Sequence, residues 1–161
     1  IPVSQVSPLQ LDGKTVSSSR IRQLVIAGDV AEAGALLGCP HRIRGQVVPG
    51  DARGRTIGFP TANLQTSSEL IPARGVYAVR ARWEDGPWHP GVANLGTRPT
   101  FDGQGFLIEV HLMNFEGDLY GQTLEVDFVD RLRGELPFES AEQLVAQIES
   151  DVAVAQQVLS E

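Results

Sequence analysis

The chain has 161 residues, of which 42% are hydrophobic and 20% are charged, so it is long enough to bury the core of one domain. These proportions are those of a soluble globular protein and exclude a disordered chain or a fibre. The net charge of −7 argues against a nucleic-acid partner, because phosphate backbones are bound by an excess of lysine and arginine.

Cys39 is the only cysteine, so the sequence has no intrachain disulfide and no cysteine-based metal cluster. No apolar run is long enough to cross a bilayer, and the N-terminus lacks the features of a signal peptide. We therefore expect a cytoplasmic protein without a membrane partner. The chain begins at Ile1 without an initiator methionine, which suggests a piece of a longer chain.

The front of the chain predicts two short helices. Ser17 is expected to cap the first helix, which should end near Gly28. Asp29 is expected to cap the second helix in a capping box with Glu32, and Gly38 should end that helix.

After Pro40 the pattern changes to apolar alternation with frequent turn residues, which predicts strands. In the strand at residues 76–83, the odd positions form an apolar face and the arginines lie on the other face. Turns are expected at residues 85–86 and 116–118, and the other strands at residues 45–48, 91–95, 107–113 and 124–128. Hairpin-spaced strands in so small a domain predict an antiparallel barrel, and the lack of strand-helix-strand alternation argues against a Rossmann fold.

The tail of the chain predicts the clearest helix. Ser140 and Gln143 have the spacing of a capping box. An apolar stripe follows and is expected to pack on the barrel wall; its members are Leu144, Ile148, Val152, Ala155 and Leu159.

Residues 50–63 concentrate glycines, arginines and hydroxyl groups in one loop, a composition that suits the binding of a polyphosphate. The spacing is not that of a P-loop, and Gly58 and Pro60 are expected to stop a helix from starting. The alternative interpretation is an ordinary surface turn. Because Pro60 favours an extended backbone, Thr61 and Asn63 are expected to point the same way.

Glu109 is the acidic residue with the best position for chemistry, in mid-strand on the face opposite the aliphatic side chains. The alternative is that Glu109 and His111 form the solvated side of a half-buried strand. The histidines lack the spacing of a zinc site. Arg133 and Phe138, between the last strand and the last helix, are either ligand contacts or ordinary packing.

Five stretches together resemble the riboflavin kinase family, in order and spacing across residues 43–155. They are RGRTIGFPTANL (53–64), GVY (75–77), NLGTRPTF (94–101), IEVH (108–111) and LRGELPF (132–138). The resemblance implies a mainly β fold, a six-stranded antiparallel Greek-key-type barrel with a C-terminal helix. It also implies transfer of the γ-phosphoryl of ATP to the ribityl 5′-hydroxyl of riboflavin, giving FMN, with Mg²⁺ as cofactor.

The resemblance also implies a role for each matched residue. These roles are Glu109 as general base; Thr61 and Asn63 as ligands of Mg²⁺; Gly50, Arg53, Gly54, Arg55 and Thr56 around the phosphates; Tyr120 near the nucleotide; and Arg133 and Phe138 near the flavin.

The front end, residues 1–40, resembles the end of the adenylyltransferase module of bifunctional riboflavin kinase/FAD synthetases, and residues 41–161 would be the kinase domain. The H-x-G-H motif of that module is absent, so we expect no FAD synthesis from this chain. Two alternatives remain: a flavin-binding barrel without catalysis, and an interaction module with an acidic docking surface.

Overall fold

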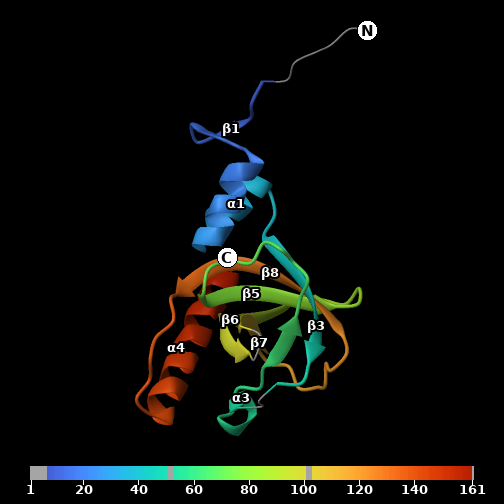
Figure 1. The fold of residues 1–161 in the computed structure, drawn as a ribbon, viewed down its shortest axis with the longest axis vertical. Helices are drawn as coiled ribbons and strands as arrows, with labels where there is room; N and C mark the ends of the chain where they lie inside the picture. Colours follow the sequence, from blue (N-terminus) through green and yellow to red (C-terminus); the bar gives the residue numbers. More distant parts are fainter. Residues whose placement is uncertain (1–6, 51–52, 101–102, 161) are drawn as a thin grey trace.

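The computed structural model describes residues 7–50, 53–100 and 103–160 (Figure 1). A short hairpin of β1 (Gln10–Leu11) and β2 (Lys14–Thr15) precedes the helices α1 (Ser18–Ala27) and α2 (Val30–Leu37). The later strands are β3 (His41–Val48), β4 (Ala62–Gln65), β5 (Gly75–Trp83), β6 (His89–Thr100), β7 (Gly103–Leu112) and β8 (Thr123–Arg133). One helical turn, α3 (Arg53–Thr56), lies between β3 and β4, and the long helix α4 (Ala141–Ser160) follows β8. In these residues no helix has the length and apolarity needed to cross a membrane.

Among the described residues, six antiparallel strands close into a barrel in the order β3-β4-β7-β6-β5-β8. Strands β5, β6 and β7 follow one another in space as they do in sequence, and β8 returns to lie beside β5, which is the Greek-key order. The predicted barrel is confirmed. The turn after β7 does not form a hairpin, however, because β8 pairs with β5 and β3 and thereby removes both remaining sheet edges.

The alternation in β5 separates the inside of the barrel from the outside, as predicted. Tyr77, Val79 and Ala81 are completely buried in the core, and the ring of Tyr77 meets Phe128 edge-on at 5.4 Å. Arg80 points to the other side, where its guanidinium donates to the carbonyl of Leu159. The middle of the barrel is therefore filled by side chains.

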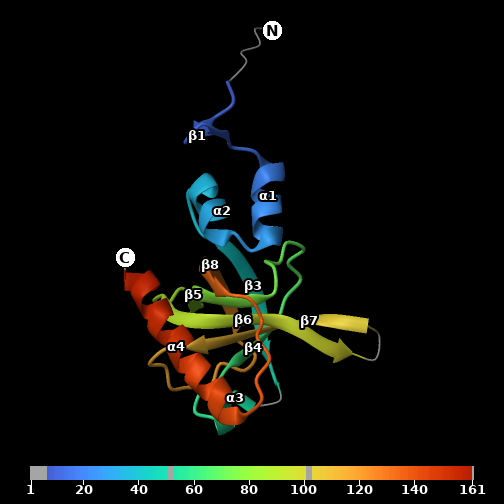
Figure 2. The same ribbon diagram turned by 90° about the vertical axis from the view of Figure 1, so that its left-hand side faces the viewer.

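Helix α4 covers part of the outer surface of the barrel (Figure 2). Its Val152 and Ala155 pack against Val76 and Ala78 of β5 and against Val92 of β6. The C-terminal half of the predicted stripe thus packs on the barrel wall as expected.

The start of α4 differs slightly from the predicted capping box. The backbone N–H of Gln143 donates to the hydroxyl of Ser140, as predicted. The side-chain oxygen of Gln143, however, accepts from the N–H of Glu139 rather than from that of Ser140.

The first helix begins and ends as predicted. The Ser17 hydroxyl accepts a hydrogen bond from the backbone N–H of Arg20 at 3.3 Å. Gly28 ends α1 with φ of 90°, a backbone conformation that glycine adopts without steric cost.

The capping box predicted for the second helix is wrong. Asp29 occupies the cap position of α2, but its side chain makes no capping hydrogen bond. Glu32 instead binds Lys14 and Arg20, each at 2.9 Å. Two cations compete better for this carboxylate than one backbone N–H does.

Helix α2 contributes to the barrel rather than standing apart from it. Val30 is buried in the same cluster of apolar side chains as Phe128 and Tyr77. In both ribbon views α1 and α2 lie at one end of the barrel (Figure 1, Figure 2).

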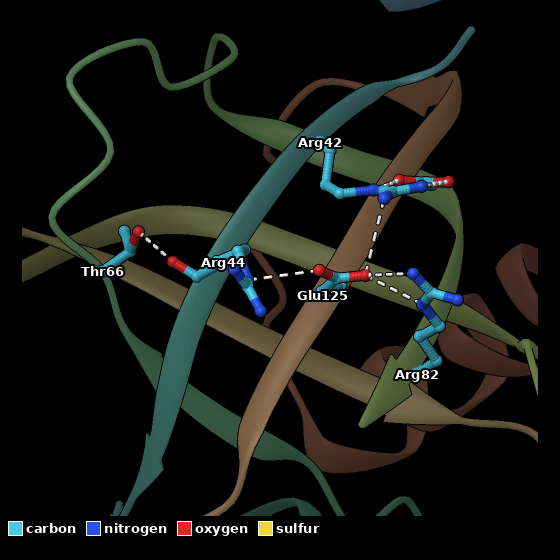
Figure 3. A network of polar contacts seen from close by, with 6 residues as sticks. Arg42, Arg44, Thr66, Arg82 and Glu125 are labelled. Carbon is cyan, nitrogen blue, oxygen red and sulfur yellow. Dashed lines mark hydrogen bonds and ion pairs between the residues drawn. The ribbon is translucent and has the colours of Figure 1, made fainter. Parts of the chain in front are cut away.

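On the outer surface, a carboxylate on β8 joins three strands (Figure 3). Glu125 lies 2.8 Å from Arg82 of β5, 3.2 Å from Arg44 and 3.5 Å from Arg42 of β3. Arg42 also binds both oxygens of Asp127, at 2.6 and 3.0 Å. The hydrogen bond from Arg82 is the largest influence that lowers the pKa of Glu125 below its usual value.

We predict that Glu125→Gln lowers the free energy of unfolding by about 1–2 kcal/mol at pH 7, because three arginines lose one shared carboxylate at a partly exposed site. Urea titration of the wild type and the variant measures this loss. The folded-state pKa of Glu125 is lowered, so its contribution is present above the usual glutamate range and is lost as the pH falls through the lowered value. The difference between the two proteins should therefore shrink in acid.

The control for this prediction is Glu149→Gln, at an exposed position of α4. It removes the same charge and should leave the unfolding midpoint nearly unchanged. Equal unfolding midpoints at pH 7 for the wild type and Glu125→Gln would contradict a stabilising role for the cluster.

Candidate functional site

The part of the glycine- and arginine-rich segment at residues 53–61, called the glycine-arginine loop below, turns back on itself just before β4. The N–H groups of Ile57 and Phe59 both donate to the carbonyl of Gly54, at 3.3 and 2.8 Å. Gly58 has φ of 88° and ends the helical turn α3. The expectation that no helix starts here is wrong for this single turn, because Gly58 and Pro60 limit the helix without preventing its first turn.

Two glycines, Gly54 in this loop and Gly50 before it, allow the backbone to approach the predicted metal ligands. A Cβ atom on Gly54 would lie 2.2 Å from the carbonyl oxygen of Phe59 and 3.4 Å from the hydroxyl of Thr61. A Cβ atom on Gly50 would lie 2.1 Å from the side-chain nitrogen of Asn63. Any larger residue at either position would displace the groups around Thr61 and Asn63.

Asn63, Glu109 and Asn94 lie in one row across β4, β7 and β6. Asn63 pairs with Glu109, and Glu109 pairs with Asn94. Paired residues share a face of the sheet, and the neighbours Ile108 and Val110 are buried in the core, so the row lies on the outer face. Sequence reasoning missed Asn94, since the pairing that brings it beside Glu109 is not visible in β6 alone.

Two cavities of the described structure meet at Thr61, which lines both. The first has a volume of about 230 Å³ and the second about 240 Å³. The first is lined by Val47, Arg55, Pro60, Thr61, Ala62, Val110, Leu112, Phe115, Glu116, Gly117, Asp118, Leu119 and Tyr120. The second is lined by Gly54, Ile57, Phe59, Thr61, Val76, Val92, Asn94, Glu109, His111, Arg133, Leu144, Ile148 and Asp151.

The second cavity lies between the outer face of the barrel, the loop before β4 and α4. Leu144 and Ile148, the first members of the apolar stripe of α4, line it instead of packing fully on the sheet. Glu109 comes from the barrel side of the same cavity. The result is a largely apolar space with a carboxylate on one wall, which suits a flat aromatic molecule that carries a hydroxyl group.

Arg133 lines this cavity, but its guanidinium is held by the protein. It binds Asp151 of α4 with two parallel contacts, at 3.0 and 2.7 Å. Asp151 is only 5% exposed and also accepts a hydrogen bond from Gln147. This ion pair attaches α4 to the end of β8 and so holds one wall of the cavity.

Phe138 does not line either cavity in the described structure. Its ring lies 5.9 Å from the guanidinium carbon of Arg133, so it contacts the ion pair rather than the cavity. Asp151 was missed from the sequence, although an acidic residue inside the apolar stripe between Ile148 and Ala155 is a signal that could have found it.

The first cavity has an apolar floor and a polar rim. Its floor includes Leu119 and Val110, both buried. Tyr120 lies at the rim with its side chain half exposed, and its backbone N–H donates to Asp118. Arg55 reaches the same cavity from the glycine-arginine loop.

The remaining predicted phosphate residues are spread around the loop. Gly50 contacts Asn63 but lines neither cavity, and Thr56 is exposed outside both. Arg53 begins α3, and its side chain lies outside the part of the chain that the structure describes.

The residues predicted to hold Mg²⁺ offer oxygen ligands, which this ion prefers. Within the described chain, no cluster of three or more histidine, cysteine or acidic side chains forms a metal site. The Thr61 hydroxyl and the side-chain oxygen of Asn63, whose amide group packs against Gly50, are oxygen donors of the kind that this ion accepts.

Comparison with known proteins relates most of this chain to one family. The family described as "Flavokinase: Riboflavin kinase" matches residues 37–159. A bifunctional riboflavin kinase/FMN adenylyltransferase of Haemophilus influenzae is 46% identical over 145 residues, which cover 90% of this chain and 47% of the relative. The chain thus spans about half the length of the relatives it matches.

Two solved structures share the fold. One, from Streptococcus pneumoniae and named as a macrolide-efflux protein, has a TM-score of 0.89 at 43% identity. The match covers 94% of this chain and 50% of the Streptococcus chain. Riboflavin kinase from Trypanosoma brucei has a TM-score of 0.55 at 25% identity, with 74% and 77% of the two chains covered. The efflux activity in the first name concerns the Streptococcus protein alone. From the family match over residues 37–159 and the close bifunctional relative, this chain belongs to the riboflavin kinase family.

Proposed function

We propose that this chain transfers the γ-phosphoryl of ATP to the ribityl 5′-hydroxyl of riboflavin and produces FMN and ADP. The observation that carries the proposal is the position of Thr61, which lines both cavities while Glu109 lines the second. A phosphoryl transfer between two small molecules needs two adjoining binding sites with the reacting groups at their junction.

Riboflavin occupies the second cavity in this proposal. Leu144 and Ile148 provide apolar surface for the isoalloxazine ring, and the Arg133–Asp151 ion pair holds α4 in place beside it. The ribityl chain extends toward Glu109 and Thr61, where its terminal hydroxyl meets the nucleotide.

ATP occupies the first cavity, with its phosphates directed toward Thr61. Gly54 and Arg55 lie beside this junction, Arg53 and Thr56 belong to the same loop, and Gly50 precedes it. Tyr120 at the rim is placed to contact the base or ribose. Arginine side chains favour phosphate because they present several donors in one plane.

Glu109 acts as general base in the proposed step. Its carboxylate accepts the proton of the 5′-hydroxyl while the hydroxyl oxygen bonds to the γ-phosphorus, and the bond from that phosphorus to the bridging oxygen of ADP breaks. A primary alcohol is a poor nucleophile at neutral pH, and a positioned base contributes about 10²–10⁴ in rate.

Thr61 and Asn63 would hold Mg²⁺ between the phosphates and the protein. When bound, this ion neutralises charge that develops on the transferred phosphoryl group. Neither residue is charged, so the metal should bind strongly only together with the nucleotide.

We also infer that residues 1–40 are the end of an adenylyltransferase module and residues 41–161 the kinase domain. The half-length match to the bifunctional relative supports this division, and the missing H-x-G-H motif argues against FAD synthesis by these residues. The burial of Val30 in the barrel core indicates that the remnant also stabilises the kinase.

The direct test is incubation of the chain with riboflavin, ATP and Mg²⁺, followed by chromatography. We expect FMN to form only when all three are present, and the absence of FMN would refute the proposed activity. Titration of riboflavin fluorescence then separates the alternatives: quenching without product indicates a flavin-binding barrel, and no quenching indicates an interaction module.

Glu109→Gln should lower turnover by about 10²–10⁴ and leave riboflavin affinity within a fewfold of the wild type, because the amide keeps the shape but cannot accept the proton. Steady-state kinetics and fluorescence titration measure the two quantities. Glu149→Gln, an exposed charge removal on α4, is the matched control and should retain full turnover. Near-normal turnover of Glu109→Gln would remove this residue from the mechanism.

Thr61→Ala should weaken nucleotide binding about tenfold when Mg²⁺ is present, the cost of about one metal or hydrogen-bond contact. Calorimetric titration with ADP, with Mg²⁺ and with EDTA, measures the effect. Thr61→Ser keeps the hydroxyl and should bind like the wild type. An equal loss for Thr61→Ala in EDTA would contradict a role in metal binding.

A further inference from the structure

The strand pairing that holds Asn63, one of the proposed magnesium ligands, does not extend to the other, Thr61. The pairing of β4 with β7 ends at Ala62, which lies opposite Val110. Pro60 has no N–H group and cannot continue the ladder. Some other contact must therefore hold Thr61 in place.

His111 provides that contact from the neighbouring strand. It is two residues beyond Glu109 on β7 and lines the same cavity. Its Nδ1 atom lies 2.9 Å from the carbonyl oxygen of Pro60. A carbonyl oxygen only accepts, so the imidazole must carry a proton on Nδ1 and donate it.

The same imidazole also contacts the residue before Pro60. The ring of Phe59 meets His111 edge-on, with 5.4 Å between the ring centroids and an angle of 73°. The N–H of Phe59 donates to the carbonyl of Gly54, where an added Cβ atom would lie 3.4 Å from the Thr61 hydroxyl. His111 therefore holds the backbone that leads into Thr61 and also the turn that lies against Thr61.

We propose that His111 is a positioning residue, which fixes the Thr61 hydroxyl at the junction of the two cavities by its hydrogen bond to Pro60. The hydrogen bond between His111 and Pro60 does not depend on the proposed kinase function, but its effect on the binding of Mg²⁺ and nucleotide rests on that function. The imidazole binds the Pro60 carbonyl beyond the last ladder pair, and the position of the Thr61 hydroxyl depends on this contact.

Two substitutions separate the hydrogen bond from the ring contact. His111→Asn keeps an amide N–H near the position of Nδ1 and loses the ring. His111→Phe keeps an aromatic ring against Phe59 and loses the donor. If the hydrogen bond is what positions Thr61, the asparagine variant should resemble the wild type and the phenylalanine variant should not.

The first measurement needs no ligand and no activity. Amide hydrogen exchange of the peptide that covers residues 59–65 should be about 5- to 10-fold faster in His111→Phe than in the wild type, the effect expected from one lost hydrogen bond. The rate in His111→Asn should lie within twofold of the wild type. Equal exchange in all three proteins, or faster exchange in the asparagine variant alone, would overturn the proposal.

The second measurement follows Mg²⁺-dependent binding of ADP by calorimetry. His111→Phe should weaken ADP binding about 5- to 10-fold with Mg²⁺ and have little effect in EDTA, a pattern that general loosening of the fold would not produce. In a Thr61→Ala background the same substitution should cost less than twofold, because its effect acts through Thr61. Additive losses, or an equal loss in EDTA, would overturn the proposal.

Folding and function are controlled separately. If His111→Phe does not fold by circular dichroism, His111→Gln takes its place, since its amide nitrogen matches the more distant Nε2 position and should also lose the bond to Pro60. If the wild type forms no FMN, the proposed function fails, while hydrogen exchange still decides whether His111 holds this segment.

Discussion

The site depends on the register between β4 and β7, which sets Asn63 opposite Glu109. Side chains alternate between the two faces of a strand, so a slip of one residue would turn Glu109 into the apolar core and expose Val110. Burying an unpaired carboxylate costs several kcal/mol, roughly the stability of a whole small domain, so this register is strongly favoured. The core side chains of the barrel thereby determine where the chemical groups lie.

Because side chains fill the middle of the barrel, the second cavity lies on its outer surface and needs walls from other elements. The apolar stripe of helix α4 both packs on the barrel and lines the second cavity. Its Val152 and Ala155 pack on the sheet, while Leu144 and Ile148 face the second cavity. The ion pair between Arg133 and the buried Asp151 attaches α4 to the end of β8. Without this partner, Asp151 would be an unpaired buried charge and would destabilise the fold.

The local predictions succeeded where the signal lies within a few residues. The alternation in β5 and the glycine at the end of α1 were predicted because each depends on steric properties of nearby residues. The capping box of α2 failed because Lys14 and Arg20 compete for Glu32. The contact of Arg133 with Asp151 was not predicted, because the two residues are 18 positions apart and meet only when α4 packs against the barrel.

The sequence by itself determined the antiparallel barrel and the outward face of Glu109, because the strand period acts locally. It also carried the motifs by which the family was recognised. Only the tertiary structure decided that Asn94 lies beside Glu109, that Thr61 stands between two cavities, and that His111 supports Pro60. These contacts join residues far apart in the chain, and their geometry exists only once the barrel has closed.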